Sequence, residues 1–79
     1  MKNCKRKHLD YVFVNHIKEY RIAKGITQEE LGALVGCSRN TIASLERGDS
    51  EPSAYIACLL AEALDTKFEI LFELRKIEE

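Results

Sequence analysis

Apolar residues recur at the three- and four-residue spacing of helices through the middle of this chain, and capping residues separate the segments. The pattern predicts helices over residues 16–24, 28–35, 39–47 and 54–64. The predicted N-caps are Asn15, Thr27, Ser38 and Ser53, and Thr27 forms a capping box with Glu30. The residues expected to point into a common core are Ile17, Leu31, Leu34, Val35, Ile42, Leu45, Ile56, Leu60 and Leu64.

The two ends of the chain show different patterns. A second capping box, residues 66–69, predicts a short fifth helix that ends near Phe72. The β-branched and aromatic segment 11–14 predicts a strand. Residues 73–77 alternate polar and apolar, which fits either a matching strand or a continuation of the fifth helix. Residues 1–8 are basic and are expected to be a flexible tail, either solvated or in contact with phosphates, so that residues 9–79 form a single domain.

Length and composition limit the classes of protein that this chain can be. It has 79 residues, of which 46% are apolar and 32% charged, and this predicts one small folded domain with a thin core. No apolar run reaches the roughly 18 residues of a membrane span, and no secretion signal follows the basic start. Three scattered cysteines do not suggest a disulfide framework, and Cys37 and Cys58 are expected to fill the core. We therefore expect a cytoplasmic protein with no membrane partner.

Candidate catalytic and metal-binding groups are sparse. Cys4 and His8 lack the second pair of ligands that a zinc site needs, and His16 has no nucleophile and orienting group near it in the sequence. A chain of this size also has little room for both a core and a cleft. We expect neither enzymatic activity nor a bound metal or cofactor.

The net charge of −1 hides an asymmetry along the chain. Residues 1–50 carry nine basic and six acidic residues, a net +3, whereas residues 51–79 carry three basic and seven acidic residues, a net −4. Only the first two thirds of the chain therefore suit a polyanionic partner such as nucleic acid.

The second and third predicted helices, about residues 28–47, are joined by a tight turn in the helix-turn-helix arrangement. Gly32 has no side chain where the third helix is expected to cross the second, and Ile42 and Leu45 anchor the third helix to the core. The outward residues of the third helix are then Arg39, Asn40, Ala43, Ser44 and Arg47. Arginine pairs with guanine, and asparagine with adenine, in the major groove of DNA. Glu46 would repel phosphate there, so it requires an inward partner.

From Asn15 to about Phe72 the chain resembles the phage Cro/repressor-type helix-turn-helix family, also called the xenobiotic-response-element family. The resemblance is carried by Arg21, residues 25–31 (Gly-Ile-Thr-Gln-Glu-Glu-Leu), residues 35–42 (Val-Gly-Cys-Ser-Arg-Asn-Thr-Ile), residues 45–48 (Leu-Glu-Arg-Gly) and Pro52-Ser53. It implies an all-α, five-helix domain, and the extra flanks resemble small repressors whose terminal segments form a β-ribbon. It also implies a sequence-specific regulator of transcription, a repressor that binds a palindromic operator in double-stranded DNA as a homodimer.

The resemblance also assigns roles to individual residues. It implies base contacts for Arg39, Asn40 and Ser44. It implies backbone contacts for the residues Gln28, Thr41 and Arg47, and an ion pair between Arg21 and Glu46, which supplies the inward partner. Ser38, at the start of the third helix, completes the expected DNA-binding set.

Two further expectations concern protein partners. The apolar residues of segment 66–79 are too many for one short helix and one strand to bury, and this predicts a dimerisation region there. They are Phe68, Ile70, Leu71, Phe72, Leu74 and Ile77. An alternative to the homodimeric repressor is an antitoxin that binds a toxin protein as well as its own operator.

Overall fold

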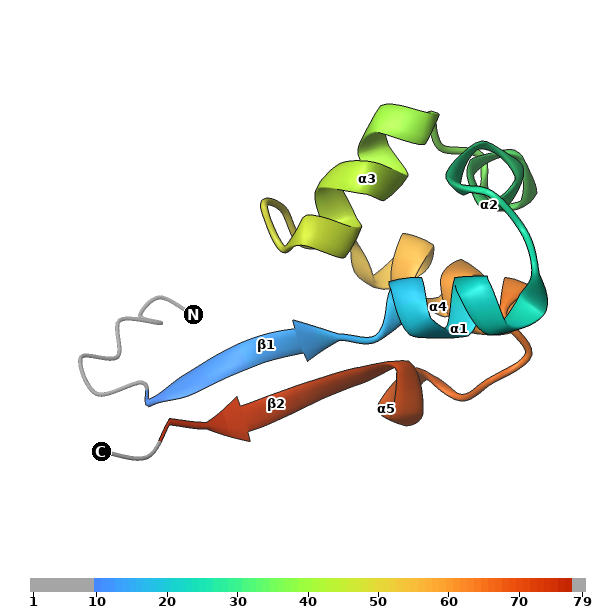
Figure 1. The fold of residues 1–79 in the computed structure, drawn as a ribbon. Coiled ribbons are helices and arrows are strands. Elements are labelled where there is room, and N and C mark those ends of the chain that lie inside the picture. The colour runs from blue at the N-terminus through green and yellow to red at the C-terminus, as the bar shows by residue number, and fades with distance from the viewer. Residues whose placement is uncertain (1–9, 78–79) are drawn as a thin grey trace.

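In the computed structural model, residues 10–77 are described, and they form five helices beside a two-stranded ribbon (Figure 1). The predicted tail of residues 1–8 and the Cys4–His8 spacing lie outside the described residues. The elements are, in order, β1 (Tyr11–Asn15), α1 (Ile17–Lys24), α2 (Gln28–Val35), α3 (Arg39–Arg47), α4 (Ala54–Ala63), α5 (Phe68–Leu71) and β2 (Phe72–Lys76). None of the helices in this part of the chain has the length and apolar character that crossing a membrane demands.

The core lies among the helices and reaches the base of the ribbon. Its buried side chains are Ile17, Leu31, Val35, Ile42, Leu45, Ala57, Leu60, Ala61, Leu64, Leu71 and Phe72. Every helix contributes to this set, so burial of apolar surface fixes the position of each helix against the others.

Three of the predicted N-caps are confirmed. The Thr27 hydroxyl accepts a hydrogen bond from the Glu30 amide at 3.0 Å, and the Glu30 carboxylate accepts one from the Thr27 amide at 2.8 Å. The Ser38 and Ser53 hydroxyls each accept one hydrogen bond, from the Thr41 and Ile56 amides at 3.1 Å, and so cap α3 and α4 without a reciprocal bond. These caps satisfy amides that have no partner within their own helix, and they set where α2, α3 and α4 begin.

The other two predicted caps, Asn15 and Thr66, have different outcomes. Asn15 is the last residue of β1, opposite Phe72, and His16 takes the N-cap position of α1. The Asn15 side-chain oxygen nevertheless accepts a hydrogen bond from the Ile17 amide at 3.1 Å, so Asn15 does cap the start of α1. Thr66 does not cap α5, because it lies in the turn after α4 and its amide donates back to the Ala61 carbonyl at 3.0 Å. The helix α5 begins two residues later, and Lys67 precedes it without a side-chain cap.

Two predictions of burial are also wrong. The Leu34 side chain is 59% exposed, because the buried face of α2 runs through Leu31, Val35 and Gly32. A Cβ atom on Gly32 would lie 2.4 Å from the Cys37 carbonyl oxygen, so the residue that approaches this glycine belongs to the turn and not to α3 itself. Cys58 is exposed instead of filling the core, whereas Cys37 is partly buried and packs against it.

The terminal segments pair as an antiparallel ribbon, and this confirms the strand alternative for the segment after α5. The register runs from Tyr11 opposite Lys76 to Asn15 opposite Phe72. Figure 1 shows the ribbon extending away from the helical body, with α5 at its base. Phe72 begins this strand and is buried, so it belongs to the core of the single subunit.

Candidate nucleic-acid interface

The helix α3 is held to the body by one face and presents the other to solvent. Ile42 and Leu45 are buried on the inner face. On the outer face Arg39, Asn40 and Arg47 are exposed, and Ser44 is half-buried. The outward orientation predicted for this helix is therefore the one found.

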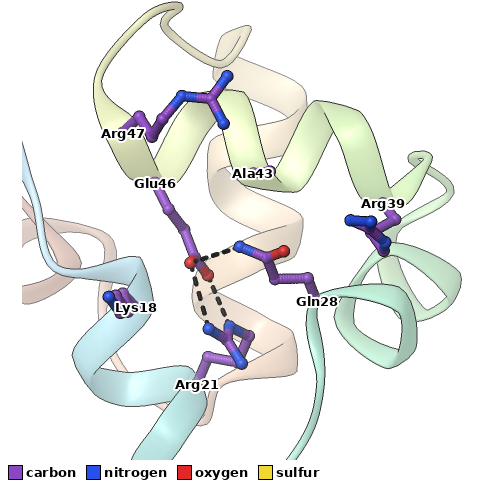
Figure 2. Close-up of a pocket in the computed structure, with 7 residues that line it drawn as sticks. All are labelled: Lys18, Arg21, Gln28, Arg39, Ala43, Glu46 and Arg47. Carbon is purple, nitrogen blue, oxygen red and sulfur yellow. Dashed lines mark hydrogen bonds and ion pairs between the residues drawn. The ribbon is translucent and has the colours of Figure 1, made fainter.

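Glu46 points inward and forms the centre of a buried polar cluster (Figure 2). Its carboxylate accepts hydrogen bonds from Arg21 Nε at 2.7 Å, Arg21 Nη2 at 3.3 Å and Gln28 Nε2 at 3.0 Å. The side chains of Glu46 and Arg21 are only 4% and 12% exposed. Arg21 also donates to the Ile26 carbonyl at 2.9 Å. The cluster thus joins α1, the loop before α2, the first residue of α2, and α3. Its hydrogen bonds also compensate the charge of Glu46, which is the one carboxylate on α3.

Several of the expected DNA-binding residues already have partners within the protein. The Ser38 and Thr41 hydroxyls lie 3.0 Å apart, and the Ser44 hydroxyl lies 3.0 Å from that of Ser50. Arg47 Nε donates to Asp49 at 2.7 Å in an ion pair that is more than half exposed on both sides. Exposed pairs of this kind contribute little to stability, so phosphate can compete for the guanidinium.

Arg39 and Asn40 differ from these residues. Both are exposed, and within residues 10–77 neither side chain takes part in a hydrogen bond. They are the first two residues of α3, the end of a helix that enters the groove when a helix-turn-helix binds DNA. A guanidinium and an amide without internal partners can pair with base edges without first breaking a contact.

An open hollow of about 630 Å³ lies between α1 and the outer face of α3. Its lining includes four long basic side chains, those of Lys18, Arg21, Arg39 and Arg47, and Figure 2 shows them around it. The lining residues are Lys18, Arg21, Gln28, Arg39, Ala43, Glu46 and Arg47. Arg21 compensates Glu46 and Arg47 pairs with Asp49, so the charges of Lys18 and Arg39 leave this surface positive.

Lys18 is absent from the set expected from the sequence, although it lines the hollow. It lies one helical turn before Arg21 on α1, and that spacing is the only signal in the sequence for its position. Lys18 stands beside the buried cluster and is exposed, so its ammonium group is available to an anionic ligand.

Comparison with known proteins identifies the family. The model of a family described as helix-turn-helix matches residues 17–71. An HTH-type transcriptional regulator of Bacillus subtilis, YgzD, is 40% identical over 62 residues, which cover 78% of this chain and 94% of that protein. Another from Methanocaldococcus jannaschii, MJ0272, is 38% identical over 58 residues, 73% of this chain and 88% of that protein.

Solved structures agree with this assignment. The P22 c2 repressor, crystallised with a synthetic operator, is 33% identical with a TM-score of 0.68, and the match covers 70% of this chain and 83% of that one. The restriction-modification controller protein C.AhdI from Aeromonas hydrophila is 38% identical with a TM-score of 0.67 and the same coverage. The resemblance found in the sequence is confirmed: this chain belongs to the Cro/C1-type helix-turn-helix family of DNA-binding transcriptional regulators, a class of proteins that are not enzymes.

Proposed function

We propose that this protein represses transcription by binding a palindromic operator as a homodimer, with α3 of each subunit in the major groove. The observation that carries the proposal is the state of Arg39 and Asn40, which are exposed and make no side-chain hydrogen bond within residues 10–77, on a helix fixed by the buried cluster around Glu46. A repressor with the same fold that was crystallised with an operator supports this mode of action.

In this proposal the residues around α3 divide into two groups. Arg39 pairs with guanine and Asn40 with adenine, and Ser44 contributes a further base contact. The remaining residues hold the DNA backbone, because hydroxyls, amides and basic side chains are the usual donors to phosphate oxygens. They are Gln28, Ser38, Thr41 and Arg47, together with Lys18 at the rim of the hollow.

The dimer follows from the geometry of DNA. Two recognition helices about 34 Å apart meet successive major grooves on one side of the duplex. A two-fold axis between two subunits then requires a palindromic site. The comparisons give no support to the antitoxin hypothesis, so a toxin is not part of this proposal.

The first test is selection of bound sites from random duplex DNA, followed by measurements on the best site. We expect Arg39→Ala to weaken binding by about 1–3 kcal/mol, roughly 5- to 150-fold, and to relax the preference at one base position. Arg75→Ala is the matched control, because it removes the same charge from an exposed position on β2. We expect it to change neither quantity.

The second test separates base contacts from phosphate contacts. Lys18→Ala should weaken binding to all sequences about equally and reduce the dependence of affinity on salt concentration. The proposal fails if Arg39→Ala and Asn40→Ala both leave affinity and base preference unchanged, or if binding does not respond to salt.

A further inference from the structure

The two faces of the β-ribbon differ in chemistry. Residues opposite each other in an antiparallel pair project to the same side, so the register assigns Tyr11, Phe13, Leu74 and Lys76 to one face. The other face carries Val12, Val14, Glu73 and Arg75. On the first face the Phe13 ring stacks on that of Phe72 at 5.5 Å, and the Phe68 ring of α5 lies 5.2 Å from Phe72. We call the exposed residues of this continuous surface, Tyr11, Phe13, Phe68 and Leu74, the aromatic face.

The aromatic face is exposed to an extent that a lone subunit does not explain. Its four side chains are between 41% and 67% exposed. A two-stranded ribbon is marginally stable by itself and needs its apolar face covered. Only the base of this ribbon is covered, where Phe72 is buried against the body.

The area of this surface matches what a small dimer requires. At about 150–250 Å² for a large side chain, the four residues leave on the order of 400 Å² of apolar surface on each copy. Interfaces are about 60% apolar, so this corresponds to roughly 650 Å² per copy and about 1,300 Å² in total. That total lies within the range of stable protein–protein interfaces, which begins near about 1,200 Å².

We propose that a second copy of this chain packs against the aromatic face, so that the homodimer is formed through the ribbon and α5. The proposal rests on the homodimer of the proposed function and identifies the surface through which its two subunits contact each other. A two-fold axis places the same apolar patch of both copies in contact. Lys76, whose ammonium group lies 5.9 Å from the centre of the Tyr11 ring, then stays at the rim, where interfaces tolerate charge.

Two features favour a second copy over residues 1–9 of the same chain. That segment carries four basic residues, and its only large apolar residues are Met1 and Leu9, which is too little to cover three aromatic rings and a leucine. The aromatic face also draws equally on both ends of the chain, with Tyr11 and Phe13 from β1 and Phe68 and Leu74 from the C-terminal part. The dimerisation region expected at residues 66–79 is therefore extended to include β1.

Sedimentation equilibrium of the full chain at tens of micromolar, without DNA, tests the proposal. We expect twice the mass of one chain for the unmodified protein and a single-chain mass for Leu74→Glu. The dissociation constant of that variant should rise at least about 100-fold, because the carboxylate would lose its water without gaining a partner. Val12→Glu is the matched control, since it places the same charge on the opposite face of the same ribbon, and it should leave the dimer intact.

The proposal is overturned if the unmodified protein is a monomer or if the Leu74→Glu variant still dimerises. It is also overturned if Val12→Glu loses the dimer to the same extent, because that result would point to pairing between strand edges. Leu74 is 67% exposed, so Leu74→Glu should keep the circular dichroism of the folded chain. If it does not, Tyr11→Glu replaces it. Arg39→Ala separates the two proposals, because it should dimerise normally while losing base preference.

Discussion

The buried cluster around Glu46 makes a quantitative prediction for the stability of the domain. Replacing Glu46 by alanine removes three hydrogen-bond acceptor contacts, two for Arg21 and one for Gln28. It also leaves the Arg21 guanidinium, only 12% exposed, without its counter-charge. Arg21 keeps a single contact of those described, with the Ile26 carbonyl.

The expected loss is large for a domain of this size. Truncating one partner of a buried ion pair costs about 3–5 kcal/mol, because the remaining charge stays desolvated. A chain of 79 residues has a total stability of about 4–12 kcal/mol at 0.05–0.15 kcal/mol per residue. Glu46→Ala should therefore consume much of the stability and lower Tm by about 4–8 °C for each kcal/mol lost.

Thermal and denaturant unfolding of a double-mutant cycle provide the measurement. Arg21→Met combined with Glu46→Leu removes both charges and fills the space, so the double variant should be more stable than the Glu46→Leu single variant. Asp49→Ala is the control, because it breaks an ion pair of the same type at an exposed site and should cost no more than about 1 kcal/mol. Losses that simply add in the cycle would show that the two charges do not stabilise each other and would refute this reasoning.

Two other predictions concern the turn and the ribbon. Gly32→Ala should destabilise the domain by about 1–3 kcal/mol in denaturant unfolding, because the added Cβ atom would meet the Cys37 carbonyl. This loss should outweigh the better helix propensity of alanine, and Ala33→Gly measures the effect of propensity alone. A gain in stability for Gly32→Ala would contradict the close approach. The hydrogen bond from Arg75, and to a lesser extent the His16 ring with its Nε2 atom 3.5 Å from the carboxylate, hold the pKa of Glu73 below its usual 4.5. Glu73 should therefore stabilise the fold fully above about pH 4.5 and progressively less as the pH falls through its lowered pKa. The difference in Tm between the unmodified protein and Glu73→Gln should be smaller in acid below that pKa than at about pH 6, and a difference that grows in acid would reverse this assignment.

Local signals in the sequence were sufficient to predict most of the helices. The hydroxyl caps at Thr27, Ser38 and Ser53 satisfy amides a few residues away, so their effect does not depend on distant parts of the chain. For the terminal segments, alternation and β-branched residues predicted the first strand but left residues 73–77 open between a strand and a continued helix, and the structure shows the strand over the described range.

The errors arose where tertiary contacts override local patterns. Leu34 has helical spacing suited to burial, but the buried face of α2 includes Gly32, where the turn approaches closely, and Leu34 lies outside that face. Thr66 has the sequence of a cap, yet Asp65 adopts the left-handed conformation, at φ 56°, that ends α4, and the Thr66 amide bonds back to Ala61. Neither effect can be read from the neighbouring residues alone.

In the candidate site, too, some features could be predicted from the sequence and others depend on tertiary contacts. The outward position of Arg39 and Asn40 followed from the helical period, and the Arg21–Glu46 pair followed from the family resemblance. The hydrogen bonds of Ser44 to Ser50 and of Arg47 to Asp49 depend on the path of the loop after α3. The position of Lys18 beside the hollow depends on how α1 packs against α3, and the one-turn spacing to Arg21 is the only local signal for it.

Asn15 connects the β-ribbon, which carries the proposed dimer surface, to α3, the helix proposed to enter the major groove. It is the last residue of β1, yet its side-chain amide donates to the Leu45 carbonyl of α3 at 2.9 Å, and its side-chain oxygen accepts from the Ile17 amide of α1 at 3.1 Å. The adjacent His16 amide donates to the Leu71 carbonyl at the end of α5. One direct hydrogen bond therefore ties the ribbon to α3, and two further bonds tie its base to α1 and α5. If two ribbons pack together, these contacts help to set the distance between the two copies of α3. The spacing of half-sites in the operator then depends on the geometry of the ribbon as well as on that of the helix-turn-helix.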